Sequence, residues 1–251
     1  MFRGFYNLTS GMLTQQRNLD VVGNNLTNVS TSGFKQSRYT ATTFDEVMLS
    51  WAGTKDKSYQ EIGGPYAYIR ATSQIYTDYS QGLPEPTNIT LDFAIEGAGF
   101  FAIRGDDGQT YYTRSGTFTL DNEGYLCYPG KGRIIGADGQ DIRLNTDRID
   151  ADKSGNMYNY DGNLLGTLGI YTFADNEAQL QHEGEGFFTG QGAQLDENPL
   201  VHWQYLERAN VDMIQQMTEL LTCQRSLQSA AQVSKMYDNM MTKTTNDVGR
   251  L

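Results

Sequence analysis

The sequence predicts an α+β protein in which long N- and C-terminal helices form a coiled coil and enclose an all-β central domain of short strands. All five prolines and most of the 27 glycines lie between residues 41 and 205, so both ends lack the strongest helix breakers. The ends show helical apolar spacing, whereas the middle shows short alternating runs separated by turns. We therefore expect a discontinuous helical coiled-coil assembly domain at 1–45 plus 205–251 and a central β domain at 46–204.

The first helix is predicted to run from Arg3 to about Asn28. Its apolar residues recur at alternating steps of three and four, which is typical of a seam between helices, and Gln15 interrupts them. We assign these apolar residues to an assembly interface: Phe5, Leu8, Met12, Leu19, Val22, Leu26 and Val29. Short polar side chains then follow, and Gly33 can adopt the positive φ that ends a helix.

The C-terminal segment carries a second and longer apolar stripe, of which the following residues belong to the predicted interface: Met213, Met217, Leu220, Leu227 and Ala231. The stripe runs through Met213, Met217, Leu220, Gln224, Leu227 and Ala231 before it shifts phase to Val233, Tyr237 and Met240. Because this helix exceeds the first in length, part of its stripe has no cover within the chain. Association with other copies or related subunits is therefore expected.

The central segment is predicted to be built from hairpins. Thr117–Leu120 and Tyr125–Tyr128 alternate in polarity around a four-residue turn that ends in Gly124. Further short runs separated by turn residues favour a barrel or a sandwich-like domain, and they lie at Tyr66–Arg70, Leu91–Ile95, Phe100–Arg104, Arg133–Gly136 and Gly169–Phe173.

Composition argues against several classes of function. The net charge is -11, from 19 basic and 30 acidic residues, which disfavours binding to nucleic acid or to an anionic membrane. No run approaches the roughly 18–20 apolar residues of a membrane span, so membrane insertion is not expected. The first residues also lack the charged and apolar regions of a cleavable signal. Cys127 and Cys223 are most simply two unpaired thiols.

Catalytic patterns are absent from the sequence, so we expect no enzyme, no catalytic residue and no cofactor. Histidine, the commonest general base, occurs only at positions 182 and 202. His182-Glu183-Gly184-Glu185 lacks the second histidine of a zinc-hydrolase motif. The glycine pairs at 97–99 and 184–186 lack the rest of a dinucleotide-binding pattern.

Residues 150–161 are the sharpest candidate for a metal site. Oxygen-bearing side chains at 150, 152 and 154, a glycine at 155 and Asp161 approach a calcium-binding loop. The last ligand is Asp rather than Glu, and the flanks are not helical, so we favour a hairpin turn from Asp152 to Gly155 and assign no metal ligand. The alternative function is a ligand- or calcium-binding β protein with helical oligomerisation arms. Its groove could be lined by Tyr66, Tyr68, Tyr76 and Tyr79.

Several motifs resemble those of the bacterial flagellar basal-body rod and hook protein family. The signature residues follow the first apolar stripe, and they are Asn24, Asn25, Asn28, Ser30, Thr31, Gly33 and Phe34. Similar motifs recur in the expected order at 91–101, 113–126, 210–212 and 224–225. Thr27 and Leu227 depart from the family's usual residues without changing the pattern.

The resemblance implies a structural rod subunit of the proximal or distal type. Such a subunit self- and co-assembles through its terminal helices into a helical tube that transmits torque and encloses the export channel. The implied partners are other copies, neighbouring rod and hook proteins, and the flagellar export apparatus. The implied location is the flagellar basal body, outside the cytoplasmic membrane, after unprocessed type III export.

Overall fold

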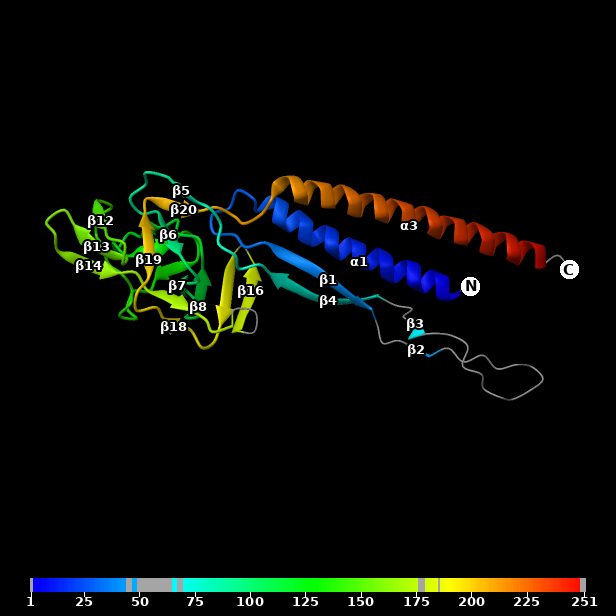
Figure 1. Ribbon diagram of the computed structural model, residues 1–251, viewed down its shortest axis with the longest axis horizontal. Coiled ribbons are helices and arrows are strands. Elements are labelled where there is room, and N and C mark those ends of the chain that lie inside the picture. Colours follow the sequence, from blue (N-terminus) through cyan, green and yellow to red (C-terminus); the bar gives the residue numbers. More distant parts are fainter. Residues whose placement is uncertain are drawn as a thin grey trace. The chain divides into compact units, whose positions relative to one another are not determined.

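A computed structural model describes residues 2–43, 47–48, 65–66, 70–175, 179–184 and 186–248 (Figure 1). The chain forms two compact units. The helical unit comprises Met1–Leu26, Ser37–Tyr76 and Met213–Leu251, and the β unit comprises Thr27–Gln36 and Thr77–Asp212. The predicted α+β class, with helices at both ends and a β-rich centre, is confirmed. The predicted domain ranges, 1–45 plus 205–251 and 46–204, stay a prediction.

The helical unit contains the two long helices and two short ribbons. Helix α1 spans Phe2–Thr27 and helix α3 spans Met213–Val248, over 26 and 36 residues. Strand β1 (Ser37–Thr43) pairs with β4 (Arg70–Thr77), and β2 (Val47–Met48) pairs with β3 (Pro65–Tyr66). The predicted run Tyr66–Arg70 falls partly outside the described residues, since 67–69 are not among them.

The helices end where the sequence changes character. Helix α1 ends one residue before the predicted Asn28, and a turn follows in which the Thr31 N–H donates to the Asn28 carbonyl at 3.0 Å. Gly33 then takes a φ of 69°, the left-handed region that glycine tolerates. Val29 therefore lies beyond the helix and not on its apolar stripe, which corrects the prediction. Neither described helix is long and apolar enough to cross a membrane.

The β unit is organised around one nine-stranded sheet. Its main path runs β16-β17-β8-β7-β11-β10-β9, and β15 joins β7 to β18. These strands span Phe100–Gly105 (β7), Thr110–Thr113 (β8), Thr119–Leu120 (β9), Leu126–Tyr128 (β10), Gly132–Ile134 (β11), Ile170–Thr172 (β15), Leu180–Gly184 (β16), Phe187–Gly190 (β17) and Gln194–Leu195 (β18).

Three smaller sheets complete the β unit. A three-stranded sheet joins β12, β13 and β14, and two pairs join β19 to β6 and β20 to β5. Their bounds are Pro84–Pro86 (β5), Phe93–Glu96 (β6), Ile149–Ala151 (β12), Asn156–Asn159 (β13), Leu164–Thr167 (β14), Leu200–Trp203 (β19) and Tyr205–Glu207 (β20).

The predicted hairpin at 117–128 is confirmed. Leu120 of β9 faces Leu126 of β10 in antiparallel register. The turn forms because Asp121 Oδ1 accepts the N–H groups of Glu123 and Tyr125, at 2.9 and 2.8 Å, while Gly124 takes a φ of 82°.

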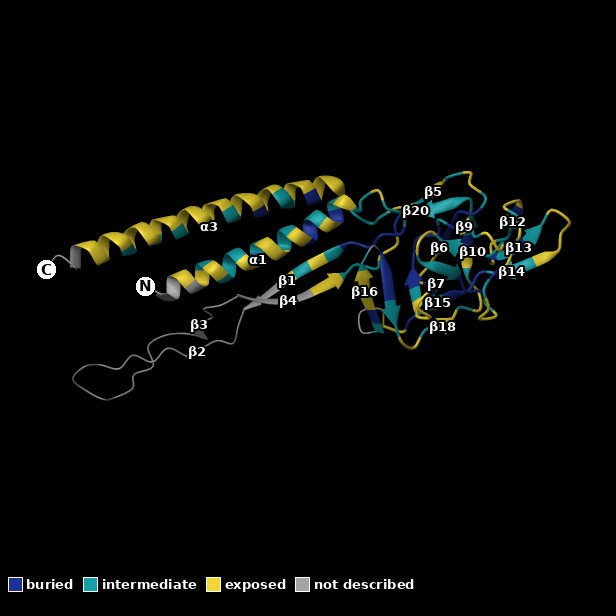
Figure 2. Ribbon diagram, turned by 180° about the vertical axis from the view of Figure 1, so that it is seen from behind, coloured by how far each residue is buried: buried dark blue, intermediate teal, exposed yellow. Residues whose placement is uncertain are grey.

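The core of the β unit consists of inward-facing residues from most of its strands. Phe93, Phe101, Ile103, Leu126 and Ile134 belong to a large cluster and are at most 1% exposed. Figure 2 shows this buried interior in contrast to the mostly exposed surface of α3. The β unit therefore carries its own core, whereas α3 leaves most of its surface uncovered.

Candidate assembly surface

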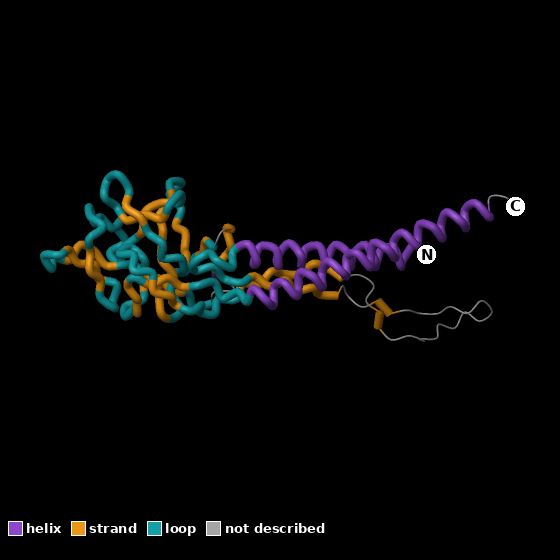
Figure 3. Tube along the Cα trace, turned by 90° about the horizontal axis from the view of Figure 1, so that it is seen from above, coloured by secondary structure: helices purple, strands orange, loops and turns teal. Residues whose placement is uncertain are grey.

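The contact between α1 and α3 centres on polar side chains. The Asn25 amide Nδ2 donates to Gln216 Oε1 at 3.1 Å, and both residues are 1% exposed. Seven residues earlier on α1, the Asn18 amide donates to Cys223 Sγ at 3.2 Å and to Glu219 Oε1 at 3.4 Å. The helices thus lie side by side and antiparallel over this region (Figures 1 and 3).

Asn25 also binds the start of strand β1. Its Oδ1 accepts the Ser37 N–H at 2.9 Å, and its Nδ2 donates to the Ser37 carbonyl at 2.7 Å. One signature amide therefore connects α1, β1 and α3 within the helical unit. Asn25 was assigned to the family signature, but its place between the helices was not predicted.

Helix α3 has one covered face. Its least exposed residues recur at steps of four and three, as in a helix seam, and they are Gln216, Leu220, Cys223, Leu227, Ala230, Ser234, Tyr237 and Met241. Leu220 and Leu227 from the predicted interface belong to this face. Tyr237 lies on the phase-shifted part of the predicted stripe, and the other members are polar, small or fall outside that stripe.

Two apolar patches on α3 remain exposed. The first patch consists of Met213, Ile214, Met217 and Leu221, which are 46%, 78%, 43% and 53% exposed. The second patch consists of Val233, Met236 and Met240, which are 38%, 61% and 55% exposed. At 100° per residue the two patches lie on different sides of the helix, and both differ from the covered face. Ala231 is exposed as well.

The predicted stripe of α1 is only partly covered within the chain. Val22 is buried, Phe5 is exposed at 42%, and intermediate exposure is shared by Leu8, Met12, Leu19 and Leu26. Three further buried positions lie beside the stripe, namely Thr14, Val21 and Asn25. Val29, beyond the helix, lines a hollow of about 230 Å³ in the β unit with Ser30, Pro86 and Leu206.

The later signature residues belong to the β unit, and Gly33 fixes their position. The Gly33 N–H donates to the Glu207 carbonyl at 2.7 Å, and a Cβ at this position would lie 2.2 Å from the Ser115 nitrogen. The neighbouring Ser32 hydroxyl bonds Ser115 and Thr117, at 2.8 and 2.9 Å. Phe34 is 1% exposed. Only glycine allows so close an approach of the two backbones.

Lys35, Glu207 and Arg114 form a buried charge cluster beside this approach. Lys35 Nζ lies 2.5 Å from Glu207 Oε1, and Arg114 Nη1 lies 3.4 Å from Glu207 Oε2. The side chains of Lys35 and Glu207 are 0% exposed, and that of Arg114 is 2% exposed. Two cations therefore share one carboxylate away from solvent.

Backbone groups satisfy the rest of the charge cluster. Lys35 Nζ donates to the Ser80 carbonyl at 2.8 Å, and the Gly82 N–H donates to Glu207 Oε1 at the same distance. Burial lowers the pKa of the Lys35 amine and of the Arg114 guanidinium, while the Glu207 carboxylate acts in the opposite direction on both. The cluster serves packing and orientation, because its side chains are 0–2% exposed to solvent.

Asn210 ties together the segments that enter and leave the β unit. Its Oδ1 accepts the Gln36 N–H at 2.7 Å, and its Nδ2 donates to the carbonyls of Asp78 and Ser80, at 2.8 and 3.1 Å. The Asp78 N–H in turn donates to the Gln36 carbonyl at 2.8 Å. The predicted motif at 210–212 therefore has a local structural role within the β unit.

The calcium-loop candidate forms the predicted hairpin. Strands β12 and β13 pair antiparallel across it, with Ala151 facing Met157. Asp152 Oδ1 accepts the N–H groups of Ser154 and Asn156, at 2.9 and 3.0 Å. The described residues contain no cluster of three or more His, Cys, Asp or Glu side chains suited to a metal.

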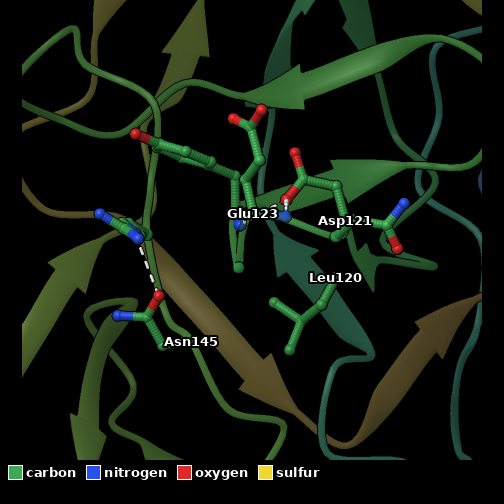
Figure 4. Close-up of a pocket in the computed structure, with 8 residues that line it drawn as sticks. Leu120, Asp121, Glu123 and Asn145 are labelled. Atoms are coloured by element: carbon green, nitrogen blue, oxygen red, sulfur yellow. Dashed lines mark hydrogen bonds between the residues drawn. The ribbon is translucent and has the colours of Figure 1, made fainter.

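A hollow of about 560 Å³ lies beside the hairpin turn at 121–124 (Figure 4). Asp121, Glu123 and Asn145 surround it, and Arg143 Nε donates to Asn145 Oδ1 at 3.0 Å. Arg133 bonds Asp121 and Glu123, at 2.9 and 2.7 Å. These polar groups are thus engaged with one another around the turn. In the suggested tyrosine groove, Tyr68 lies outside the described residues, and the Tyr79 ring packs against Phe100 and Phe188.

Three stretches of the chain match known protein families. Residues 5–35 match the family described as flagella basal body rod protein, and residues 94–158 match the flagellar hook protein FlgE/F/G D1 domain. Residues 204–247 match the C-terminal region of flagellar basal body rod FlgEFG proteins. The flagellar basal-body rod protein FlgG of Bacillus subtilis is 31% identical over 98% of this chain and 99% of its own length. The chain belongs to the flagellar basal-body rod and hook protein family.

Other members of the rod and hook family show the same relationship. FlgG of Agrobacterium fabrum is 32% identical over 92% of this chain and 94% of its own length. The flagellar hook protein FlgE of Treponema pallidum is 33% identical over 57% of this chain but only 31% of its own length. The protein is accordingly a structural subunit of the flagellar basal-body rod and not an enzyme.

Each matched stretch contributes one member of the buried charge cluster. Lys35 ends the first stretch, Arg114 lies in the second, and Glu207 lies near the start of the third. This cluster was not predicted from the sequence, although Lys35 directly follows the signature residues at 24–34 and Arg114 lies within the motif at 113–126. The available signal was a charged residue within a motif otherwise dominated by glycine, serine and apolar residues.

Proposed function

We propose that this rod subunit self- and co-assembles through its terminal helices into a helical tube that transmits torque and encloses the export channel. Its partners are further copies of itself and neighbouring rod and hook proteins. The helices form a coiled-coil assembly domain at 1–45 plus 205–251, and the β domain at 46–204 makes lateral contacts. The subunit reaches this position outside the cytoplasmic membrane through the flagellar type III export apparatus, without processing.

The observation that carries the proposal is the exposed apolar surface of α3. Helix α1 covers one face of α3, whereas the two apolar patches at 213–221 and 233–240 lie on other sides. Exposed apolar patches of this kind mark surfaces of association. Patches on different sides of one helix suit contacts with different neighbours, which produce a helical tube when the contacts do not close.

The proposed interface contains the apolar residues of α1 and α3 that were predicted from the sequence, without Val29, together with those that the exposed patches add. Side chains partly covered within the chain, such as Leu19, Leu26 and Leu227, join the intrachain seam to the intersubunit surface. Met213 and Met217 belong to the outward surface because they are 46% and 43% exposed. The family signature at 24–34 supports the helix end and its entry into the β unit.

A pair of adjacent substitutions on α3 tests this interface. Met240→Asp places a charge in the second apolar patch, whereas Asn239→Asp adds a charge on the neighbouring side of the same exposed turn. We expect Met240→Asp to lose incorporation into purified basal bodies and motility, because burying the charge between subunits is costly. Asn239→Asp retains both. Normal incorporation of Met240→Asp and of Met217→Asp would show that these patches are not the seam of the tube.

A further inference from the structure

The contact between α1 and α3 contains a pair of fully buried amides where an apolar seam would be more stable. Asn25 and Gln216 are each 1% exposed and lie 191 residues apart in the chain. Buried polar groups lower stability unless each finds a partner, so such a pair needs a compensating role. A single buried polar residue in a helix seam is the best-attested device for fixing the register of two helices.

The two polar contacts specify one antiparallel register. Asn25 bonds Gln216, and Asn18, seven residues earlier, bonds Cys223, seven residues later. The apolar residues of both helices repeat with the same heptad spacing, so they tolerate a shift of seven residues. The Asn25–Gln216 pair is lost in a shift of either direction. A shift that brings Gln216 opposite Asn18 leaves an amide contact there, but without the two Ser37 bonds that hold Asn25. A shift in one direction places Asn25 opposite residue 209, before α3 begins, and a shift in the other carries Gln216 beyond the end of α1.

The Ser37 contacts make Asn25 a rigid reference point for this register. Its Oδ1 is held by the Ser37 N–H and its Nδ2 by the Ser37 carbonyl, so the amide cannot rotate to follow a shifted α3. Gln216 is consequently the partner that must meet Asn25. Removal of the Gln216 amide leaves both Asn25 bonds to Ser37 in place.

We propose that the Asn25–Gln216 amide pair sets the register of α1 against α3 and so determines which side chains of α3 face neighbouring subunits. In the native register, Gln216, Leu220, Cys223 and Leu227 face inward, and Met213, Met217 and Met240 remain outward. The part of this inference that concerns neighbouring subunits rests on the proposed function. The register itself is a property of the single chain.

Disulfide trapping with the native Cys223 tests the register. In a Cys127→Ser background, Asn18→Cys places a thiol opposite Cys223 in the native register, because the Asn18 amide lies 3.2 Å from that sulfur. Gly11→Cys reports a shift of one heptad, and a side chain at Gly11 meets nothing within 4 Å. The isolated full-length chains are oxidised with glutathione disulfide, and mass spectrometry of peptides gives the ratio of the two cross-link yields.

Gln216→Leu is the decisive variant, and Leu220→Ala is its matched control. We expect Gln216→Leu to lower the ratio of native to shifted cross-links by about three- to tenfold, the effect of one buried hydrogen bond, without loss of thermal stability. Leu220→Ala removes apolar contact on the same face but keeps the amide pair, so the ratio stays unchanged even if stability falls.

Two outcomes overturn the proposal. One is an unchanged ratio in Gln216→Leu, and the other is an equal fall in Leu220→Ala. Because the cross-links form in the isolated chain, either result leaves the proposed tube assembly standing. Conversely, normal assembly of both Met240→Asp and Met217→Asp would contradict the proposed interface without affecting the register measurement.

Discussion

Lys35 and Glu207 are joined by a fully buried ion pair of 2.5 Å between residues 172 positions apart in the chain. Arg114 approaches the second oxygen of the same carboxylate, so two cations share Glu207. The three partners are therefore not equivalent. Loss of the shared carboxylate leaves two buried positive charges, whereas loss of one cation leaves a complete pair.

We expect Glu207→Gln to destabilise the β unit by about 3–5 kcal/mol, because it leaves buried charges without compensation. Lys35→Met keeps much of the side-chain volume and the Arg114–Glu207 contact, so its cost should be smaller, at about 1–3 kcal/mol. Urea unfolding monitored by aromatic fluorescence measures both. An equal loss of unfolding free energy in Glu207→Gln and Lys35→Met would contradict the inference that two cations share the Glu207 carboxylate.

Gly33 offers a second test, with Gly130 as a matched control. Both residues adopt positive φ, 69° and 75°, so an alanine at either position costs about 1 kcal/mol in backbone strain. A Cβ at Gly33 would also lie 2.2 Å from the Ser115 nitrogen, whereas a Cβ at Gly130 meets nothing within 4 Å. We expect Gly33→Ala to lower the free energy of unfolding by at least about 2 kcal/mol more than Gly130→Ala. A similar loss of unfolding free energy in Gly33→Ala and Gly130→Ala would show that positive φ alone, and not the close approach to Ser115, requires glycine at position 33.

Asp92 makes the stability of the β unit dependent on pH. Its side chain is buried, and Oδ2 has no hydrogen-bond partner among the described residues. Burial raises the pKa of Asp92 above its ordinary value of 3.8, against the opposing effect of a Thr87 hydrogen bond. The folded state thus holds the proton more tightly than the unfolded state. The stability contributed by protonated Asp92 is lost as pH rises through the raised pKa.

Asp92→Asn cannot titrate and should therefore gain stability relative to the native protein as pH rises from about 4 to 7. Urea unfolding at both pH values measures this difference. Asp147→Asn, at an exposed position, provides the baseline for removing a carboxylate. If the free energies of unfolding of Asp92→Asn and the native protein differed by the same amount at both pH values, ionisation of Asp92 would not destabilise the folded state.

The helices and hairpins were predictable because their signals are local. The heptad spacing located α1 and α3, and the Asp121–Gly124 turn chemistry located the β9–β10 hairpin. The order of the nine-stranded sheet was not predictable, because it depends on pairings between distant strands, such as β15 with β7. The ribbon of β1 and β4 was also missed, since few apolar residues mark it.

The candidate assembly surface was predictable in part. Hydrophobic periodicity identified Met213 and Met217 as interface residues, but it could not distinguish a face covered by α1 from a face left for other subunits. The covered face includes Gln216, which hydropathy does not single out, and Cys223, which lies outside the predicted stripe. Lys35 was hidden for a similar reason, because a lysine is normally read as solvent-exposed.

The bond from the Gly33 N–H to the Glu207 carbonyl also affects the order in which the chain folds. Direct closure of Asn25 onto Gln216 spans 191 residues. Once the β unit has joined residues 33 and 207, only short connections to residues 25 and 216 remain to be closed. The entropic cost of bringing the helices together then falls by roughly 2 kcal/mol, according to the logarithmic dependence on loop length. Folding of the middle of the chain thus prepares the pairing of its two ends, although the first of those ends is synthesised long before the second.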